Sequence, residues 1–261
     1  MISSISPLEV LGALAVGLAL GLLGGGGSIL TVPVLVFAVG LGPKAAVAAS
    51  LPIVAITSGA AALSHWRQGN VQVRTAIVFG LVAAVGGFAG ARLAAFMSGA
   101  MQFSLLGIVM LAAAFRMLIG NVKESAVDGT NKPIPYAKLV PIALVVGVIT
   151  GVVGIGGGFL ILPTLVILCQ LPMRLAVGTS LLVIAMNATS GAAGYAGQVP
   201  VDWPAVALFS VFAVAGSLTA SQISSRIPQA GLKKAFGVLL IALAVVILVQ
   251  NRHVFSGLLP S

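Results

Sequence analysis

The residues GGGGS at positions 24–28 interrupt a long apolar run, and the residues GIGGG at positions 154–158 interrupt a second run in the same way. A proline, Pro33 or Pro163, follows each cluster. Consecutive glycines disfavour a continuous helix, because each costs about 1 kcal/mol relative to alanine in a helix interior. In hydrocarbon, such a break leaves backbone N–H groups that need partners from protein, trapped water or a bound ligand. The two clusters therefore predict two interrupted helices at a functional site.

The composition indicates that lipid is the solvent for much of the chain. Of the 261 residues, 59% are hydrophobic and 7% are charged, and the mean hydropathy is +1.20. Soluble domains carry about 25% charged residues. Thirteen lysines and arginines against four acids give a net charge of +9, but the cations are scattered in short connections between apolar runs. This is typical of cytoplasmic loops that face anionic lipid, so we expect membrane lipid and no nucleic acid as a partner.

Ten apolar segments predict an all-α polytopic membrane protein. They cover residues 8–23, 29–39, 45–63, 75–97 and 103–119, and then 139–153, 159–169, 175–194, 204–225 and 232–249. We expect a first transmembrane repeat over residues 1–119, a cytoplasmic linker over 120–136, and a second repeat over 137–261. Each repeat would consist of a glycine-broken helical hairpin and three transmembrane helices, which gives about 8–10 helical segments in all.

The two halves match each other with a constant offset of 130 residues. The matched pairs include Gly24/Gly154, Pro33/Pro163, Lys44/Arg174, Ser50/Ser180 and His65/Tyr195. A single helix over residues 8–40 would be about 50 Å long and would overshoot a ~30 Å hydrocarbon core, so we expect a hairpin there, either re-entrant or fully spanning. Three further crossings are an odd number and would invert the second half. The most basic short loop also changes place between the halves, as inversion requires.

Glycine-interrupted segments at matching positions of inverted repeats indicate a secondary-transporter site near the midplane. Helices that begin just after Gly27 and Gly157 would present free N–H groups and positive dipole ends, which favour an anion. The four acids, Glu9, Glu124, Asp128 and Asp202, all lie outside the deep parts of the apolar segments. This argues against a cation pump. No metal-spaced or catalytic constellation is present in the sequence, so we expect neither an enzyme nor a cofactor.

The predicted substrate-binding residues combine the glycine clusters with polar positions on the third helix of each half. They are Gly25, Gly26, Gly27, Ser28, Ser50, Thr57, Gly156, Gly157, Gly158, Ser180 and Asn187. Ser50 and Thr57 lie seven residues apart on one helix face, and Ser180 and Asn187 are their equivalents. These four side chains either line the site or make ordinary interhelical hydrogen bonds.

Four further residues, His65, Tyr195, Lys44 and Arg174, are candidates for gating or for coupling to a proton or another ion. The alternatives are an interfacial histidine for His65 and helix-end anchors for the two cations. The pairs Gly17/Gly21, Gly86/Gly90 and Gly147/Gly151 have a spacing that predicts close helix packing. The single cysteine, Cys169, predicts a small buried hydrophobe.

Over nearly its whole length the chain resembles the sulfite exporter TauE/SafE family, within the toluenesulfonate uptake permease group. The resemblance rests on the twin glycine clusters with their prolines, on AVAASL at 46–51 and AVGTSL at 176–181, and on the stretch from Tyr195 to Trp203. It implies a permease or exporter of small sulfur-containing anions, such as sulfite or organosulfonates, in a bacterial inner membrane. A passive anion channel of the same architecture and a structural membrane subunit are the alternatives. The anion, the direction of transport, the coupling ion and the oligomeric state are left open.

Overall fold

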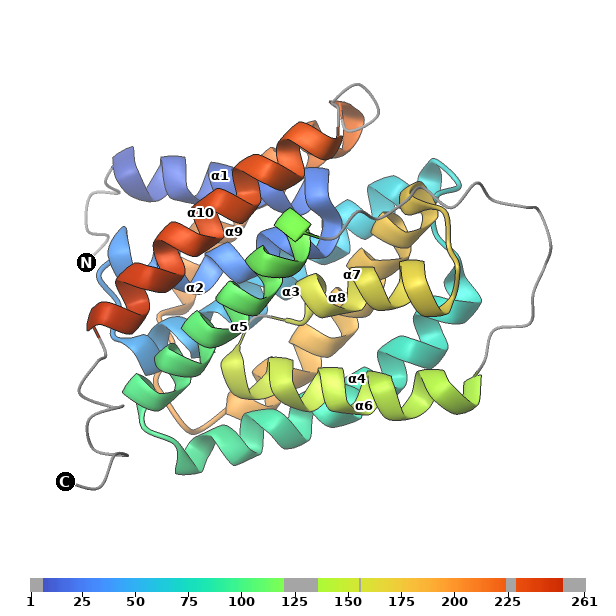
Figure 1. Ribbon diagram of the computed structural model, residues 1–261. Coiled ribbons are helices and arrows are strands. Elements are labelled where there is room, and N and C mark those ends of the chain that lie inside the picture. Colours follow the sequence, from blue (N-terminus) through green and yellow to red (C-terminus); the bar gives the residue numbers. More distant parts are fainter. Residues whose placement is uncertain (1–6, 120–135, 155, 224–228, 251–261) are drawn as a thin grey trace.

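The computed structural model describes residues 7–119, 136–154, 156–223 and 229–250, and among these residues every regular element is a helix (Figure 1). The all-α prediction is confirmed, and the helix ends lie within a few residues of the predicted segment ends. In chain order the elements are α1 (Pro7–Leu23), η1 (Gly24–Leu30), α2 (Thr31–Phe37), α3 (Pro43–Arg67), α4 (Val73–Leu93), η2 (Ala94–Phe96), α5 (Gly99–Ile119), α6 (Tyr136–Val153), α7 (Gly158–Leu168), α8 (Met173–Tyr195), α9 (Trp203–Ile223) and α10 (Gln229–Gln250).

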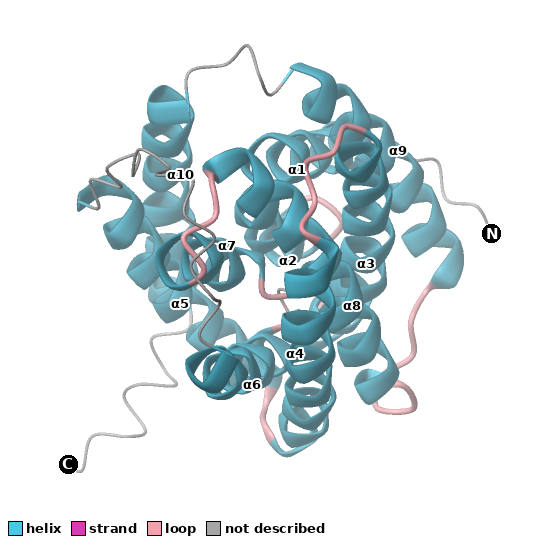
Figure 2. Ribbon diagram, turned by 90° about the vertical axis from the view of Figure 1, so that its right-hand side faces the viewer, coloured by secondary structure: helices cyan, strands magenta, loops and turns pink. Residues whose placement is uncertain are grey.

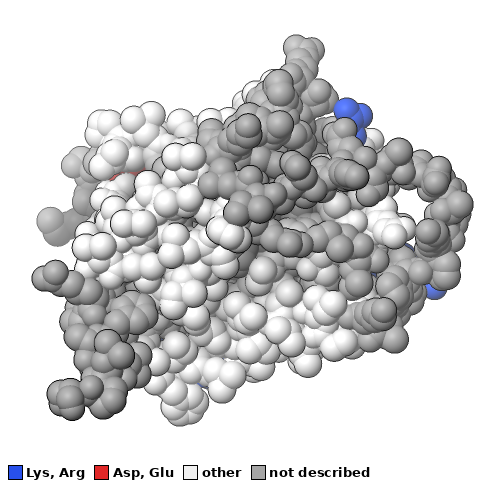
Figure 3. All heavy atoms as spheres, in the orientation of Figure 1, with Lys and Arg blue, Asp and Glu red and all other residues white. Residues whose placement is uncertain are grey.

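Large apolar side chains cover much of the outer surface, as expected of helices solvated by lipid. In the described part of the chain, α3, α4, α8 and α9 are each long and apolar enough to cross a membrane. Val85 on α4 and Val211 on α9 are 66% and 63% exposed. Among the described residues on the face drawn in Figure 3, few charged atoms are visible: cationic groups near the right-hand end and a trace of an acidic group at the upper left.

Close packing of small residues joins α1 to α9 and α6 to α4 (Figure 1). A side chain at Gly17 or Gly21 would collide with the backbone carbonyl of Ala213 or Ser217 on α9. A side chain at Gly147 or Gly151 would likewise collide with α4. The predicted packing role of these glycine pairs is confirmed. Figure 2 again shows α4 and α6 side by side. The first helix of each half, α1 or α6, thus lies against the fourth helix of the other half, α9 or α4.

The long helices α3 and α8 cross each other in opposite directions. A methyl group at Gly191 of α8 would lie 3.2 Å from Leu51 Cδ2 near the start of α3. Farther along α3, a methyl group at Gly59 would lie 3.9 Å from Ala185 Cβ, which precedes Gly191 on α8. The first residues of the two helices, Pro43 and Met173, are 130 residues apart in the sequence. Their buried faces form the centre against which the glycine clusters pack.

Candidate functional site

The two glycine clusters differ in local structure. In the first half, Gly24 has φ +60° and begins the 3-10 helix η1, which continues directly into α2. We expected a helix beginning after Gly27. The tighter winding is possible because a side chain at Gly27 would collide with the backbone of Ala19 and Leu20 on α1, and glycine avoids that collision. In the second half, Gly154, Gly156 and Gly157 all have positive φ, and α7 begins after them at Gly158.

Each cluster packs against the third helix of the opposite half. A methyl group at Gly24 would lie 3.1 Å from Val177 Cγ1 and 3.2 Å from Ser180 Oγ on α8. Gly154 contacts Val47 on α3 in the same way. The Ser50 hydroxyl lies 2.6 Å from the Gly154 carbonyl and 2.7 Å from the Val47 carbonyl, either of which can accept its proton. Ser50 and Ser180 therefore each lie beside the glycine cluster of the opposite half.

Asn187 joins three elements at the second cluster. Its amide nitrogen donates to Thr150 Oγ1 of α6 at 2.9 Å and to the Gly156 carbonyl at 3.1 Å. The side chain is 1% exposed, and its oxygen lies against Gly87 of α4 without a hydrogen-bond partner. Both amide N–H groups of Asn187 are therefore used to hold the broken segment in place.

The Cβ position of Gly156 faces apolar side chains of α3 and α8. A methyl group there would lie 2.8 Å from Val54 Cγ1 of α3, 3.3 Å from Ala188 Cβ and 3.4 Å from Ile184 Cγ2 of α8. Gly157 caps α7 with φ 95° and offers no side chain, so the first N–H groups of α7, at Gly158 and the next residue, have no acceptor within their own helix. The segment η1 contacts α7, which brings the two clusters together.

The hydroxyl groups predicted to line the site are bonded to backbone carbonyls. Thr57 Oγ1 donates to Ile53 O at 2.8 Å, and Ser180 Oγ donates to Val177 O at 2.8 Å. Ser28 is fully buried on η1. Thr57 and Ser180 thus bond within their own helices, whereas Ser50 and Asn187 bond to carbonyls of the second glycine cluster.

The four candidate gating or coupling residues lie at the ends of α3 and α8. Tyr195 OH donates to Val152 O at 3.1 Å and accepts from Gln102 Nε2 at 2.9 Å. Lys44 Nζ donates to two carbonyls of the α4–α5 connection, at 3.3 and 3.4 Å, which is the geometry of an anchor. His65 is buried near the end of α3, and Arg174 is exposed at the start of α8.

Four residues in these contacts are absent from the predicted substrate-binding residues. Gly24 and Gly154 contact the opposite half more directly than their neighbours, and their match at the offset of 130 was the signal for them. Thr150 accepts the Asn187 amide, and only its polarity within an apolar run marked it. Gln102 is fully buried and also donates to the carbonyls of Ala94 and Val152, each at 3.4 Å. Its place just before a predicted segment gave no sign of that role.

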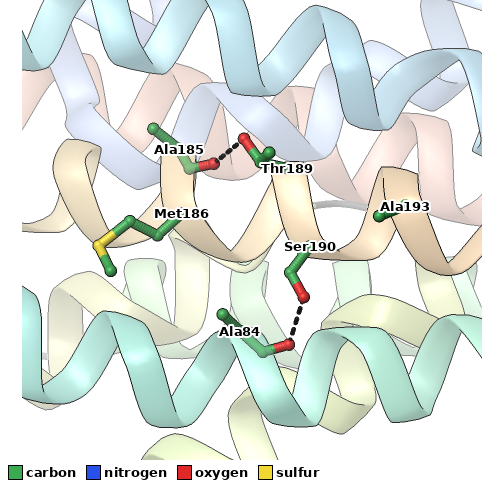
Figure 4. A pocket seen from close by; sticks show the side chains of 6 residues that line it. All are labelled: Ala84, Ala185, Met186, Thr189, Ser190 and Ala193. Atoms are coloured by element: carbon green, nitrogen blue, oxygen red, sulfur yellow. Dashed lines mark hydrogen bonds between the residues drawn. The ribbon is translucent and has the colours of Figure 1, made fainter.

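The described residues contain no group of His, Cys, Asp or Glu side chains arranged to hold a metal ion. A shallow groove of about 480 Å³ lies on the surface of α4 and α8 (Figure 4). It is lined by Ala84, Ala185, Met186, Thr189, Ser190 and Ala193. The hydroxyl groups of Thr189 and Ser190 donate to carbonyls at 2.7 and 2.6 Å, so they are already satisfied (Figure 4). This uncharged groove includes none of the predicted site residues.

Comparison with known proteins supports the picture of a transporter. A family model described as sulfite exporter TauE/SafE matches residues 9–247. A "Probable membrane transporter protein" of Xylella fastidiosa (strain Temecula1) is 32% identical over 237 residues, which cover 89% of this chain and 91% of that protein. "Probable membrane transporter protein YdhB" of Bacillus subtilis is 30% identical over 230 residues, covering 87% of this chain and 94% of that protein. No solved structure matches the chain significantly.

Proposed function

Because the chain belongs to the sulfite exporter TauE/SafE family, we propose that it is a secondary transporter of small sulfur-containing anions, such as sulfite or organosulfonates. The family and the relatives assign the chain to membrane transport and not to an enzyme class. It is a multi-pass integral membrane protein, and its bacterial relatives support the cytoplasmic (inner) membrane as its location. The substrate class follows the family's description.

One observation carries the proposal: each glycine break packs into the third helix of the opposite half. We propose residues 1–119 and 137–261 as inverted repeats joined by a cytoplasmic linker over 120–136. The opposite directions of α3 and α8 support this arrangement, as do the matched contacts of α1 with α9 and of α6 with α4. Broken helices at the interface of such repeats are where secondary transporters bind their substrates.

The anion would be held by backbone N–H groups in the first turn of η1, at Gly25 and Gly26, from one side and by those of Gly156, Gly157 and Gly158 from the other, while Gly27 and Ser28 lie farther inside η1. Ser50, Ser180 and Asn187 would support the two segments from the crossing helices, and Thr57 would lie two turns beyond Ser50 on α3. The described acids, Glu9 and Asp202, both lie at helix starts, so no described carboxylate competes with an anion at the breaks. Alternating access would then move one half against the other around the bound anion.

Transport of ³⁵S-labelled sulfite, and of a labelled sulfonate, into proteoliposomes tests the proposal. A carrier gives saturable uptake and counterflow of label against excess unlabelled anion. A passive channel gives flux without counterflow, and a structural subunit gives no flux. Counterflow with either anion supports the proposal, and its absence with both contradicts it.

The site itself is tested by Gly156→Leu, combined in a second variant with Gly26→Leu. Leucine at Gly156 must adopt φ +71° and would press on Val54, so we expect loss of uptake. Gly42→Leu is the matched control, because nothing lies within 4 Å of its Cβ position and its φ of −60° suits any residue. Normal uptake by a Gly156→Leu protein that elutes as a folded monodisperse species would refute the site assignment.

A further inference from the structure

His65 is a buried imidazole without a hydrogen-bond partner. It is 3% exposed near the C-terminal end of α3, and neither ring nitrogen is bonded to a described residue. The ring faces the backbone of Gly21 on α1 without reaching hydrogen-bond geometry, and a methyl group at Gly178 of α8 would lie 3.0 Å from His65 Cβ. A buried polar group without a hydrogen-bond partner destabilises the folded protein by about 1–3 kcal/mol. A function for His65 explains why such a residue is present here.

The equivalent position in the second half is occupied differently. Tyr195 stands 130 residues after His65, and its hydroxyl is bonded to Gln102 and to the Val152 carbonyl. The end of α8 is thereby tied to α5 and α6 by neutral hydrogen bonds. The end of α3 carries a titratable ring in the same place, and this ring makes no such bonds to the described residues. At this equivalent position the first half therefore has an unpaired imidazole, and the second half has a hydrogen-bonded phenol.

A second unpaired polar atom lies on the same face of α3. Ser58 is seven residues, or about two turns, before His65, is fully buried, and its Oγ has no partner among the described residues. Val54, one turn further back, contacts Gly156 of the second glycine break. This face of α3 thus leads from His65 past Ser58 to the proposed anion site. In the second half, Ala188 and Tyr195 stand at the equivalent positions.

The charged groups near this end of α3 are cations. On the elements packed against α3, the acid Glu9 of α1 lies in the first turn, at the opposite end of α1 from Gly21. The helices α2 and α9 contain no titratable residue. The remaining charged residues on these helices are Lys44 and Arg67 on α3, Arg74 and Arg92 on α4, Arg116 on α5 and Arg174 on α8. Lys44 and Arg92 lie at the far end of α3, next to the α4–α5 connection. No described carboxylate is placed to balance an imidazolium at His65.

We propose that His65 is the proton-binding site that couples a proton to the transported anion. This inference rests on the proposed function, because the negative charge that balances the imidazolium is the anion at the glycine breaks. A proton passes from solvent at that end of the bundle to a free ring nitrogen when the anion binds. It returns to solvent when the anion leaves. Anion binding and proton binding at His65 thus strengthen each other reciprocally.

The test compares the pH dependence of ³⁵S-sulfite uptake by the full-length protein and by His65→Gln between pH 5.5 and 8. Sulfite itself titrates in this range, but equally for both proteins, so the ratio of their uptake rates isolates the contribution of the protein. We expect this ratio to change about tenfold per pH unit over part of the range, because one coupled proton is lost. His253→Gln is the matched control, since it removes the other of the two histidines, and its ratio to the wild type should stay constant.

Each outcome decides between the two proposals. A constant ratio for His65→Gln overturns the coupling role and leaves the proposed transport standing. A wild-type protein that moves neither sulfite nor a sulfonate overturns the proposed function and this inference with it. If His65→Gln does not fold, His65→Tyr places the residue of the second half at the same position and is expected to show the same altered ratio.

A second measurement does not depend on any variant of His65. ¹⁵N-histidine NMR of the protein in nanodiscs contains two ring systems, and His253→Gln leaves the signal of His65 alone. We expect saturating sulfite to shift this ring toward the imidazolium form at a fixed pH, while the same concentration of chloride does not. An unchanged protonation state with bound sulfite overturns the proposal.

Discussion

Replacing Asn187 by alanine should loosen the second glycine break. The substitution removes the donor at 2.9 Å to Thr150 Oγ1 and the donor at 3.1 Å to the Gly156 carbonyl. Thr150 keeps its own bonds to carbonyls of α6, so the main loss falls on Gly156. Interhelical hydrogen bonds in membrane proteins contribute about 0.6 kcal/mol on average and at most about 1.7. We therefore expect Asn187→Ala to lower the free energy of unfolding by about 1–2 kcal/mol.

The matched control is Thr57→Ala, because Thr57 occupies the equivalent position and makes only a local bond to Ile53 O at 2.8 Å. Unfolding by SDS in bicelles measures both free energies. A cycle with Thr150→Ala should show a coupling of about 0.6 kcal/mol with Asn187→Ala. Sulfite uptake by Asn187→Ala should also fall, since Gly156 loses its support. If Asn187→Ala and Thr57→Ala have equal stability and uptake, Asn187 does not hold the break.

Three further predictions concern other parts of the molecule. Gly151→Leu should abolish folding, because its side chain would collide with the α4 backbone, whereas Gly42→Leu should be neutral; size-exclusion chromatography of fluorescent fusions distinguishes the two. Cys169 is half-buried and packs against the core, so maleimide should label it more slowly in the folded protein than in the SDS-unfolded protein. Equal labelling rates in the two states would instead indicate an exposed thiol. Lys44→Met should lower the thermal stability through the lost bonds to two carbonyls, with KM for sulfite unchanged; a raised KM would indicate that Lys44 attracts the anion.

The helices were predictable from the sequence because hydrophobic run length alone defines a segment that lipid can solvate. The interhelical role of Gly17 and Gly21 was also predictable, since small residues at that spacing have few other uses in a membrane helix. Cys169 is half-buried and packs against the core, close to its expected character.

The local structure of the glycine clusters was not predictable, because glycine allows several backbone conformations at similar cost. The choice between the 3-10 helix at Gly24–Leu30 and the open turn before Gly158 depends on what packs against each cluster. For the same reason, the sequence suggested Asn187 as a ligand for an anion, while its amide is used by Thr150 and Gly156. Which hydrogen bonds a polar side chain makes depends on neighbours from distant parts of the chain.

The packing of α1 against α9 also constrains how the chain is made. Gly17 meets Ala213, which is synthesised almost 200 residues later. At about 5–20 residues per second, α1 waits for roughly 10–40 s before its partner leaves the ribosome. During that interval its glycine-lined face must be covered by lipid or by another helix. By contrast, α6 finds α4 already in the membrane as it emerges. The amino-terminal half is therefore expected to complete its packing last, and a chain truncated before α9 should be recognised by the cell as unassembled.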